Sequence, residues 1–140
     1  MIRFALVGCG AISKKHIIAI SSIADAEIVA VCDVVPQVAK DTGARLGVPW
    51  YSNLTDLMAD SHIDVFSILT PTGDHASTIL ALSTTGKPLV IEKPMTLRTA
   101  DADRVIEACK QTGSKIFVIK QNRFNPPIVA LKAALDEGRF

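Results

Sequence analysis

Apolar and polar positions along the chain alternate between two patterns. Short runs that are apolar at almost every position predict parallel strands, because strands covered on both faces bury both rows of side chains. The predicted strands are Ile2–Val7, Ala26–Asp33, Val48–Tyr51, Asp64–Thr70, Pro88–Glu92 and Lys115–Lys120. Between them, apolar residues recur at helical spacing. This spacing predicts helices over Ser13–Ile23, Pro36–Leu46, Leu54–Ala59, His75–Thr85, Ala100–Thr112 and Ile128–Glu137.

Local signals mark where several of these helices begin and end. Asn53 and Thr99 are predicted N-caps of the helices that follow them, and Gly47 and Gly113 are predicted to terminate helices. Gly43 weakens the middle of its helix. Strands and helices alternate from end to end, with no repeat, low-complexity tract or obvious linker. The chain is therefore predicted to be an α/β protein with a doubly wound parallel sheet in a single domain.

The turn after the first predicted strand has the composition of a phosphate-binding loop. Gly8 and Gly10 let the backbone bend tightly and approach a diphosphate, since neither has a Cβ that would collide with phosphate oxygens. Ser13 takes the third small position and opens a helix whose unpaired N–H groups and positive dipole end would face the anion. Taken alone, the turn also fits an α/β protein that binds no nucleotide.

Asp33 supplies the second half of this pattern at the end of the second predicted strand. Its carboxylate can accept hydrogen bonds from the two hydroxyls of an adenosine ribose, and it disfavours a 2′-phosphate. Val34 and Val35 follow, and no arginine stands beside Asp33 to meet such a phosphate. The strand, the turn, the helix and the acid together predict a Rossmann-type domain that binds NAD rather than NADP.

Composition limits the partners that the chain can have. With 140 residues, 49% of them hydrophobic, the chain can bury one sizeable core and hardly two. Its net charge of +1 creates no large field, so we expect no nucleic acid and no membrane as partners. The first apolar run is broken at Arg3 and Gly8 and is too short for a signal peptide or a membrane span, which favours a cytoplasmic location.

The three cysteines predict neither a disulfide framework nor a metal site. Their number is odd, and they show no CxxC or Cys/His spacing. Cys32 and Cys109 fall in apolar patterns that are typical of a core. Cys9 lies inside the glycine turn, where packing as a small residue is favoured over a thiol activated by the helix N-terminus.

Polar residues gather where the predicted strands end. Thr70–His75 follows the fourth strand, Glu92-Lys93-Pro94 the fifth, and Gln121-Asn122-Arg123 the sixth. In open α/β sheets, ligands bind beyond the carboxyl ends of the strands. Lys93 leaves an apolar strand beside an acid and is held by the following proline, so its amine can act as a general acid or base. A surface ion pair of Lys93 with Glu92 or Asp74 is the alternative.

Three of these motifs together resemble the Gfo/Idh/MocA family of nicotinamide-dependent sugar oxidoreductases. They are the turn from Gly8 to Ser13, the Thr70–His75 segment and Glu92-Lys93-Pro94, and the resemblance covers essentially all 140 residues. The segment Lys120–Pro126 further resembles the branch that oxidises the 3-hydroxyl of UDP-N-acetylglucosaminuronic acid, on the way to diacetamido uronic acids of bacterial lipopolysaccharide O-antigen.

The resemblance implies a role for each matching residue. The cofactor-binding residues would be Gly8, Gly10, Ala11, Ile12, Asp33, Thr70, Pro71, Thr72, His75, Glu92 and Gln121, with Glu92 at the nicotinamide ribose. Lys93 would be catalytic, near the reacting carbinol. Lys93, Asn122 and Arg123 would contact the UDP-sugar substrate. From the pattern alone, His75 is a packing residue at a helix N-terminus, and Lys14 and Lys15 are solvated helix residues.

The family also carries a second α/β domain, which binds the sugar, supplies a catalytic histidine and usually makes the oligomer interface. None of His16, His62 and His75 falls after the last predicted strand, where that histidine belongs. We therefore expect residues 1–122 to form the dinucleotide-binding Rossmann domain and residues 123–140 to be a linker and the start of a helix leading to a C-terminal domain absent from this chain. The 140 residues alone would bind NAD without turnover, and the full-length dehydrogenase would be a homo-oligomer, a dimer or tetramer.

Two alternatives remain open at this point. The same fold can serve as a non-catalytic NAD-sensing or regulatory module, although the presence of Lys93 disfavours this. The protein can also be a dehydrogenase for a different sugar or polyol, or an NADP-linked imine reductase, which would differ only in substrate.

Overall fold

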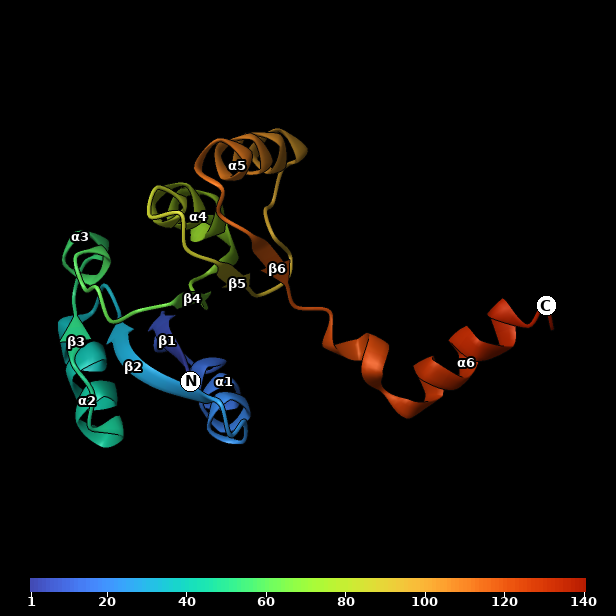
Figure 1. The fold of residues 1–140 in the computed structure, drawn as a ribbon, viewed down its shortest axis with the longest axis horizontal. Helices are drawn as coiled ribbons and strands as arrows, with labels where there is room; N and C mark the ends of the chain where they lie inside the picture. Colours follow the sequence, from blue (N-terminus) through green and yellow to red (C-terminus); the bar gives the residue numbers. More distant parts are fainter.

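The computed structural model, which describes residues 1–140, is built around a six-stranded parallel sheet (Figure 1). The strand order is β3-β2-β1-β4-β5-β6, so the chain runs outward from β1 in both directions. The strands are β1 (Ile2–Val7), β2 (Ala26–Cys32), β3 (Trp50–Tyr51), β4 (Val65–Ile68), β5 (Leu89–Ile91) and β6 (Ile116–Val118). This order is that of a dinucleotide-binding sheet, which confirms the predicted Rossmann-type fold.

Helices cover both faces of the sheet (Figure 1). On one face lie α1 (Ser13–Ser21) and α2 (Pro36–Leu46), and on the other lie α3 (Leu54–Met58), α4 (His75–Ser83) and α5 (Thr99–Thr112). Two short 3₁₀ helices, η1 (Thr72–Asp74) and η2 (Gln121–Phe124), follow strand ends. Since parallel strands need crossover connections, this arrangement follows from the alternation of strands and helices along the chain.

The core is divided by the sheet into two layers. Ala5 and Val7 belong to the larger cluster, beneath α3, α4 and α5, whereas Leu6 between them belongs to the smaller cluster with Ile20 of α1. Successive side chains of a strand point to opposite faces, so the continuous apolar run of β1 fills both layers. Because both faces of the sheet are covered, the polar residues that follow the strands meet at the carboxyl ends of the strands.

The element boundaries differ from the predicted ones mainly at the ends. The predicted bounds of β1 are confirmed, and the other five strands are shorter than predicted, by up to three residues in the cases of Asp64–Thr70 and Lys115–Lys120. The Asn53 cap is confirmed, since its side-chain oxygen accepts the Asp56 N–H at 2.9 Å. The Thr99 cap is wrong: Thr99 lies inside α5, and Arg98 holds the N-cap position without a side-chain hydrogen bond.

Gly43 is explained by close packing of α2 against β3. A Cβ at this position would lie 2.9 Å from the Val48 carbonyl oxygen and 2.9 Å from the Trp50 Cβ. Glycine lowers the helix propensity of α2 at this position, but it allows α2 to pack closely against the edge strand β3.

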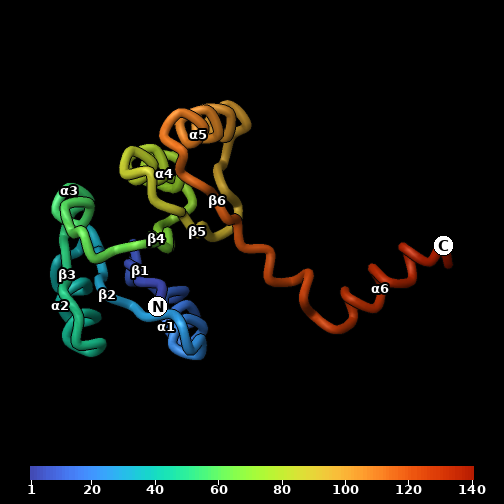
Figure 2. The backbone as a smooth tube through the Cα atoms, viewed as in Figure 1, coloured from blue at the N-terminus to red at the C-terminus, as the bar shows by residue number.

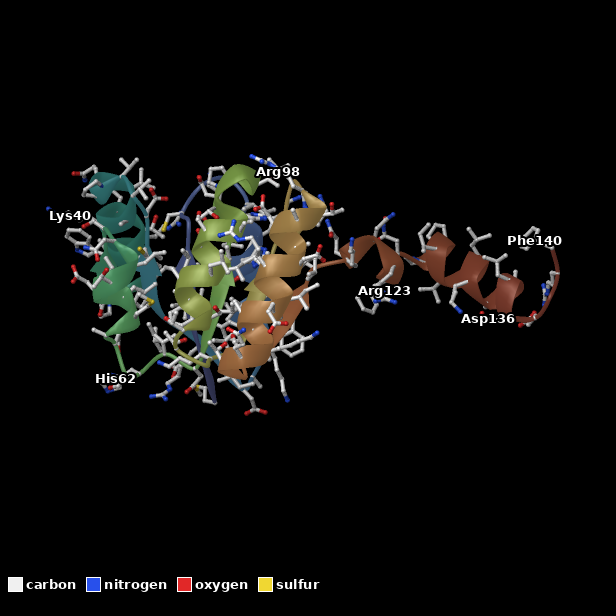
Figure 3. All side chains as sticks on the ribbon, turned by 90° about the horizontal axis from the view of Figure 1, so that it is seen from above. Lys40, His62, Arg98, Arg123, Asp136 and Phe140 are labelled. Carbon is white, nitrogen blue, oxygen red and sulfur yellow. The ribbon has the colours of Figure 1, made fainter.

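The last helix, α6 (Pro126–Asp136), extends away from the sheet and its covering helices, as the ribbon and the tube both show (Figures 1 and 2). None of its residues is buried. The view from above shows the same projecting segment with Arg123 and Asp136 on it (Figure 3). No helix of the chain combines the length and the apolar character that crossing a bilayer requires.

An ion pair joins the start of β1 to the residue before β4. Asp64 accepts hydrogen bonds from the backbone N–H of Arg3 at 2.9 Å and from its guanidinium at 2.9 and 2.7 Å. Hydrogen bonds from Arg3 hold the pKa of the Asp64 carboxyl well below its ordinary value of 3.8. The folded state therefore binds this proton less readily than the unfolded chain, so the contribution is complete above about pH 4 and is lost as the pH falls further.

We expect Asp64→Asn to lower the urea midpoint of unfolding at pH 7, and the gap to the parent to shrink as the pH falls below about 4. Fluorescence of the single tryptophan, Trp50, reports unfolding. Asp25→Asn, at an exposed carboxylate without a side-chain partner, is the control. A gap that stays constant from pH 7 to acid would contradict the assignment.

Candidate functional site

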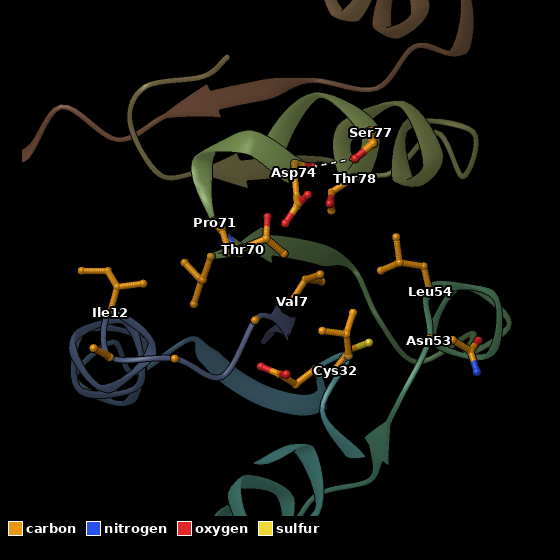
Figure 4. A pocket seen from close by; sticks show the side chains of 16 residues that line it. Val7, Ile12, Cys32, Asn53, Leu54, Thr70, Pro71, Asp74, Ser77 and Thr78 are labelled. Atoms are coloured by element: carbon orange, nitrogen blue, oxygen red, sulfur yellow. Dashed lines mark hydrogen bonds between the residues drawn. The ribbon is translucent and has the colours of Figure 1, made fainter. Parts of the chain in front are cut away.

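A cleft of about 570 Å³ opens at the carboxyl ends of β1, β2 and β4 (Figure 4). The turn after β1, which holds Asp33 through the Cys9 N–H, lines the cleft. The Thr70-Pro71 segment and the start of α4 lie across the cleft from Cys32 (Figure 4). Seven of the predicted cofactor-binding residues line it: Gly8, Gly10, Ala11, Ile12, Asp33, Thr70 and Pro71. The fold thus brings together two motifs that are far apart in the sequence.

The two glycines of the turn meet different requirements. Gly8 has a φ of 101°, and a Cβ there would lie 2.8 Å from the backbone carbon and oxygen of Leu69. The protein itself therefore requires glycine at this position. A Cβ at Gly10 would have no atom within 4 Å, so the missing side chain there leaves room in the cleft for a ligand.

Three backbone donors of the turn are free. The N–H groups of Gly10, Ala11 and Ile12 make no hydrogen bond within the protein, and α1 has no side-chain cap. Ser13 is buried and donates its hydroxyl to the Gly10 carbonyl at 2.7 Å, which closes the turn beneath these donors. Free N–H groups at the positive end of a helix dipole form a binding site for a phosphate group.

Asp33 is fixed by two backbone donors. Its Oδ2 accepts the Cys9 N–H at 2.8 Å, and its Oδ1 accepts the Val35 N–H at 2.9 Å. No cationic side chain pairs with it. Each carboxylate oxygen can accept a further hydrogen bond, so the group can hold the two hydroxyls of a ribose.

Cys9 packs inside the turn and is not activated. Burial raises the pKa of its thiol to about 11, and its Sγ lies 3.7 Å from the Cys32 carbonyl oxygen. All three cysteines are free. No group of three or more His, Cys, Asp or Glu side chains is placed to hold a metal ion.

The cleft fits a dinucleotide. The hydroxyl oxygen of Thr70 is buried without a hydrogen-bond partner in the protein, and the Thr70 side chain points into the cleft (Figure 4). Buried hydroxyls in folded proteins nearly always have a partner, so this oxygen fits a bound polar ligand. Together with the free donors of the turn and the Asp33 carboxylate, it gives polar groups along the whole cleft.

His75 lies outside the cleft lining and joins two loops. Its ring is buried, with Nε2 at 2.9 Å from the Thr70 carbonyl oxygen and Nδ1 at 2.8 Å from the Pro94 carbonyl oxygen. This is the packing role indicated by its position at a helix N-terminus. Contact of His75 with the cofactor stays a prediction.

Glu92 and Lys93 follow β5, on the other side of β4 from the turn. One oxygen of Glu92 faces His16 of α1 at 3.0 Å, and the other accepts the Lys93 N–H at 3.2 Å. The Lys93-Pro94 peptide bond is cis. Lys93 is exposed and makes no ion pair, so the alternative of an ion pair with Glu92 or Asp74 is not found.

The remaining predicted residues are not brought into the cleft. Thr72 is in η1, next to the lining residue Pro71. Gln121, Asn122 and Arg123 lie in η2 and are exposed, and Arg123 sits where the projecting segment leaves the sheet (Figure 3). Their contacts with cofactor and substrate stay predictions.

Several lining residues were not predicted as site residues. Leu54 and Asn53 approach from α3, while Asp74, Ser77 and Thr78 come from η1 and the first turn of α4 (Figure 4). A usable signal was present in α4, where Ser77 and Thr78 interrupt an otherwise apolar helix near the end that faces the strand edge. His16 was also missed, because its partner Glu92 is distant in the sequence.

Comparison with known proteins agrees with this geometry. A family model described as an oxidoreductase family with an NAD-binding Rossmann fold matches residues 2–120. The chain superposes on the WlbA dehydrogenase of Bordetella pertussis, solved with NADH and UDP-GlcNAcA, with a TM-score of 0.95 and 40% sequence identity, covering 99% of this chain and 43% of that one. The WlbA dehydrogenase of Chromobacterium violaceum, solved with the same two ligands, gives a TM-score of 0.94 and 38% identity, over 99% and 41%.

Another relative is named for an activity different from that of the WlbA dehydrogenases. Inositol 2-dehydrogenase of Rhizobium meliloti is 36% identical over 142 residues, covering 99% of this chain and 42% of that protein. The chain thus spans less than half the length of the relatives that it matches. The predicted cofactor, NAD, is confirmed.

The two glycines can be separated by substitution. We expect Gly8→Ala to lower the free energy of unfolding by about 2 kcal/mol or more, because both the clash and the positive φ oppose a Cβ. Gly10→Ala should change stability by no more than about 0.5 kcal/mol. Its affinity for NAD, measured by calorimetry, should fall at least about ten-fold, since the new methyl group enters the ligand space. Unchanged affinity in Gly10→Ala would show that the diphosphate does not approach this backbone.

Asp33→Ala should weaken NAD binding by about ten- to one-hundred-fold, because two hydrogen bonds to a charged acceptor are lost. Calorimetric titration gives the dissociation constant. Asp25→Ala removes an equivalent carboxylate at the opposite end of the same strand and should bind NAD like the parent. Equal affinity in all three proteins would remove Asp33 from the site.

Proposed function

Because the chain belongs to the Gfo/Idh/MocA family of oxidoreductases, we propose that it is the NAD-binding domain of a sugar-nucleotide dehydrogenase. The substrate is a UDP-N-acetylglucosaminuronate-type sugar, oxidised at the C3 hydroxyl. The observation that carries this proposal is the edge of the sheet itself. There, a cleft with free backbone donors and the Asp33 carboxylate opens at the ends of β1, β2 and β4, and Lys93, exposed and without an ion pair, follows the neighbouring strand β5.

The chain's own residues hold the cofactor along this edge. The N–H groups of Gly10, Ala11 and Ile12 bind the diphosphate, and Asp33 accepts the hydroxyls of the adenosine ribose. Thr70 offers its unpartnered hydroxyl from the opposite wall. The bound nicotinamide supplies the hydride acceptor.

Lys93 accepts the proton of the reacting hydroxyl. The amine lies at the carboxyl end of β5, one residue after the predicted contact to the nicotinamide ribose. As the C3 hydroxyl is oxidised to a carbonyl, its proton passes to the Lys93 amine while the hydride leaves with its electron pair from C3. Because no acid pairs with Lys93 in the chain, the amine is available to a substrate hydroxyl.

The choice of a sugar nucleotide rests on the strand-end residues and on the relatives. Arg123 supplies positive charge on the side of the sheet away from Asp33, where an anionic UDP-uronate would lie. Similarity to the two WlbA dehydrogenases solved with UDP-GlcNAcA supports this substrate. Similarity to an inositol 2-dehydrogenase supports a polyol as the second candidate.

We also propose the division of the chain into a cofactor domain over residues 1–122 and a connecting segment over residues 123–140. The family model ends at residue 120, and the projection of α6 from the sheet supports the same boundary.

The substrate proposal is tested on the protein at its full natural length by following NADH formation with a panel of UDP-sugars and inositols. We expect UDP-N-acetylglucosaminuronate to give the highest kcat/KM. Highest turnover with an inositol would replace the sugar nucleotide by a polyol. Absence of turnover with every member of the panel, while NAD still binds, would favour an NAD-sensing module.

In the protein at its full natural length, Lys93→Ala should lower kcat/KM by about 10²- to 10⁴-fold, because a positioned acid–base group is lost. Its affinity for NAD should stay within about two-fold of the parent. Lys115→Ala, at the amino end of β6, removes a lysine of similar exposure and should leave both quantities unchanged. Unchanged turnover in Lys93→Ala would exclude its catalytic role.

A further inference from the structure

A histidine–carboxylate contact links α1, the helix that follows the phosphate-binding turn, to the residue after β5. His16, at the end of the first turn of α1, places Nε2 at 3.0 Å from Oε1 of Glu92. The two side chains are only 11% and 14% exposed. On its other side, the ring faces the hydroxyl of Ser67, a buried residue of β4, at 3.2 Å from Nδ1. The imidazole is thus enclosed between two strands and one helix.

The chemistry of the partners fixes the direction of these hydrogen bonds. A carboxylate oxygen only accepts, so Nε2 of His16 carries the hydrogen that points to Glu92. In a neutral ring, Nδ1 then accepts the Ser67 hydroxyl hydrogen. The second oxygen of Glu92 accepts the N–H of Lys93 at 3.2 Å. The Glu92 carboxylate is therefore held at both oxygens, and His16 is its only side-chain partner.

The strand order shows which part of a dinucleotide this contact serves. The turn after β1 binds the diphosphate, and Asp33 at the end of β2 binds one ribose. Glu92 follows β5, which lies on the opposite side of β1, beyond β4. A dinucleotide with its diphosphate at β1 and one ribose at β2 must extend its second nucleoside toward β4 and β5.

We propose that His16 is a positioning residue: it orients Glu92 toward the nicotinamide ribose and couples that half of the cofactor site to the helix that binds the diphosphate. The proposal rests on the proposed cofactor role of Glu92. It adds a residue that is not among those lining the cleft. Positioning groups of this kind reduce the freedom of the residue that makes the contact.

Cofactor fragments separate positioning from folding. ADP contains the adenosine and the diphosphate but lacks the second ribose and the nicotinamide. We expect His16→Ala to weaken NAD binding about ten-fold while ADP binding stays within about two-fold of the parent, both measured by calorimetry. His16→Gln, which keeps an N–H donor near the position of Nε2, should recover most of the NAD affinity. Equal loss of NAD and ADP affinity would show that His16 only supports α1, and would overturn the proposal.

A double-mutant cycle tests whether His16 acts through Glu92. If it does, His16→Ala combined with Glu92→Ala should bind NAD no more weakly than Glu92→Ala alone. Additive losses would overturn the proposal. Should His16→Ala fail to fold, Ser67→Ala removes the other partner of the ring and should give a smaller loss, again for NAD and not for ADP; no loss would count against the proposal. These measurements contain no sugar substrate, so their outcome is separate from that of the substrate assay.

Discussion

The site depends on three peptide N–H groups that the protein leaves without an acceptor. Folding normally pairs buried or clustered backbone donors, and leaving them unpaired is tolerated only where solvent or a ligand reaches them. Gly8 makes this possible, because its positive φ turns the chain sharply against Leu69 and directs the start of α1 toward the strand ends. Ser13 then closes the turn from beneath. The neighbouring Asp33 is organised by the same turn, since the Cys9 N–H holds one of its oxygens.

The sheet order divides the functional residues into two groups with different surroundings. The group around β1, β2 and β4 forms a lined cleft with its polar atoms in place. The group after β5 and β6 is open: Lys93 and the residues of η2 are exposed, and Glu92 alone among them is half-buried and in contact with another element, through His16 of α1. Binding of the adenosine half therefore depends on contacts within this chain. Lys93 and Arg123, to which we assign roles in the proposed chemistry, are instead exposed at the ends of β5 and β6.

Much of this organisation could be read from the sequence, because it is local. The continuous apolar run of β1, the glycines that follow it and the acid at the end of β2 lie within a short stretch of chain, and each constrains the next. Asn53 was predictable for the same reason, since an N-cap acts on its own helix. The prediction of Thr99 as an N-cap was wrong, because the extended residue Arg98 takes the N-cap position and no side chain makes a capping hydrogen bond there.

The rest required the folded chain, because it arises from contacts between distant segments. His16 and Glu92 are 76 residues apart, and only the neighbouring positions of α1 and the end of β5 bring them together. The carbonyl groups that hold His75 come from two different loops. From the sequence, Gly43 was predictable only as a residue that weakens its helix. The fold shows that the absence of a Cβ at this position lets the helix pack closely against Trp50.

The environment of Cys9 has a consequence for how the domain tolerates oxidants. Burial raises the pKa of its thiol to about 11, so the thiol form predominates at neutral pH, whereas the thiolate is the form that peroxides and alkylating agents attack. A cysteine inside the phosphate turn would otherwise expose coenzyme binding to redox damage. Here burial keeps the sulfur of Cys9 in the thiol form, so the turn retains a small apolar side chain at this position.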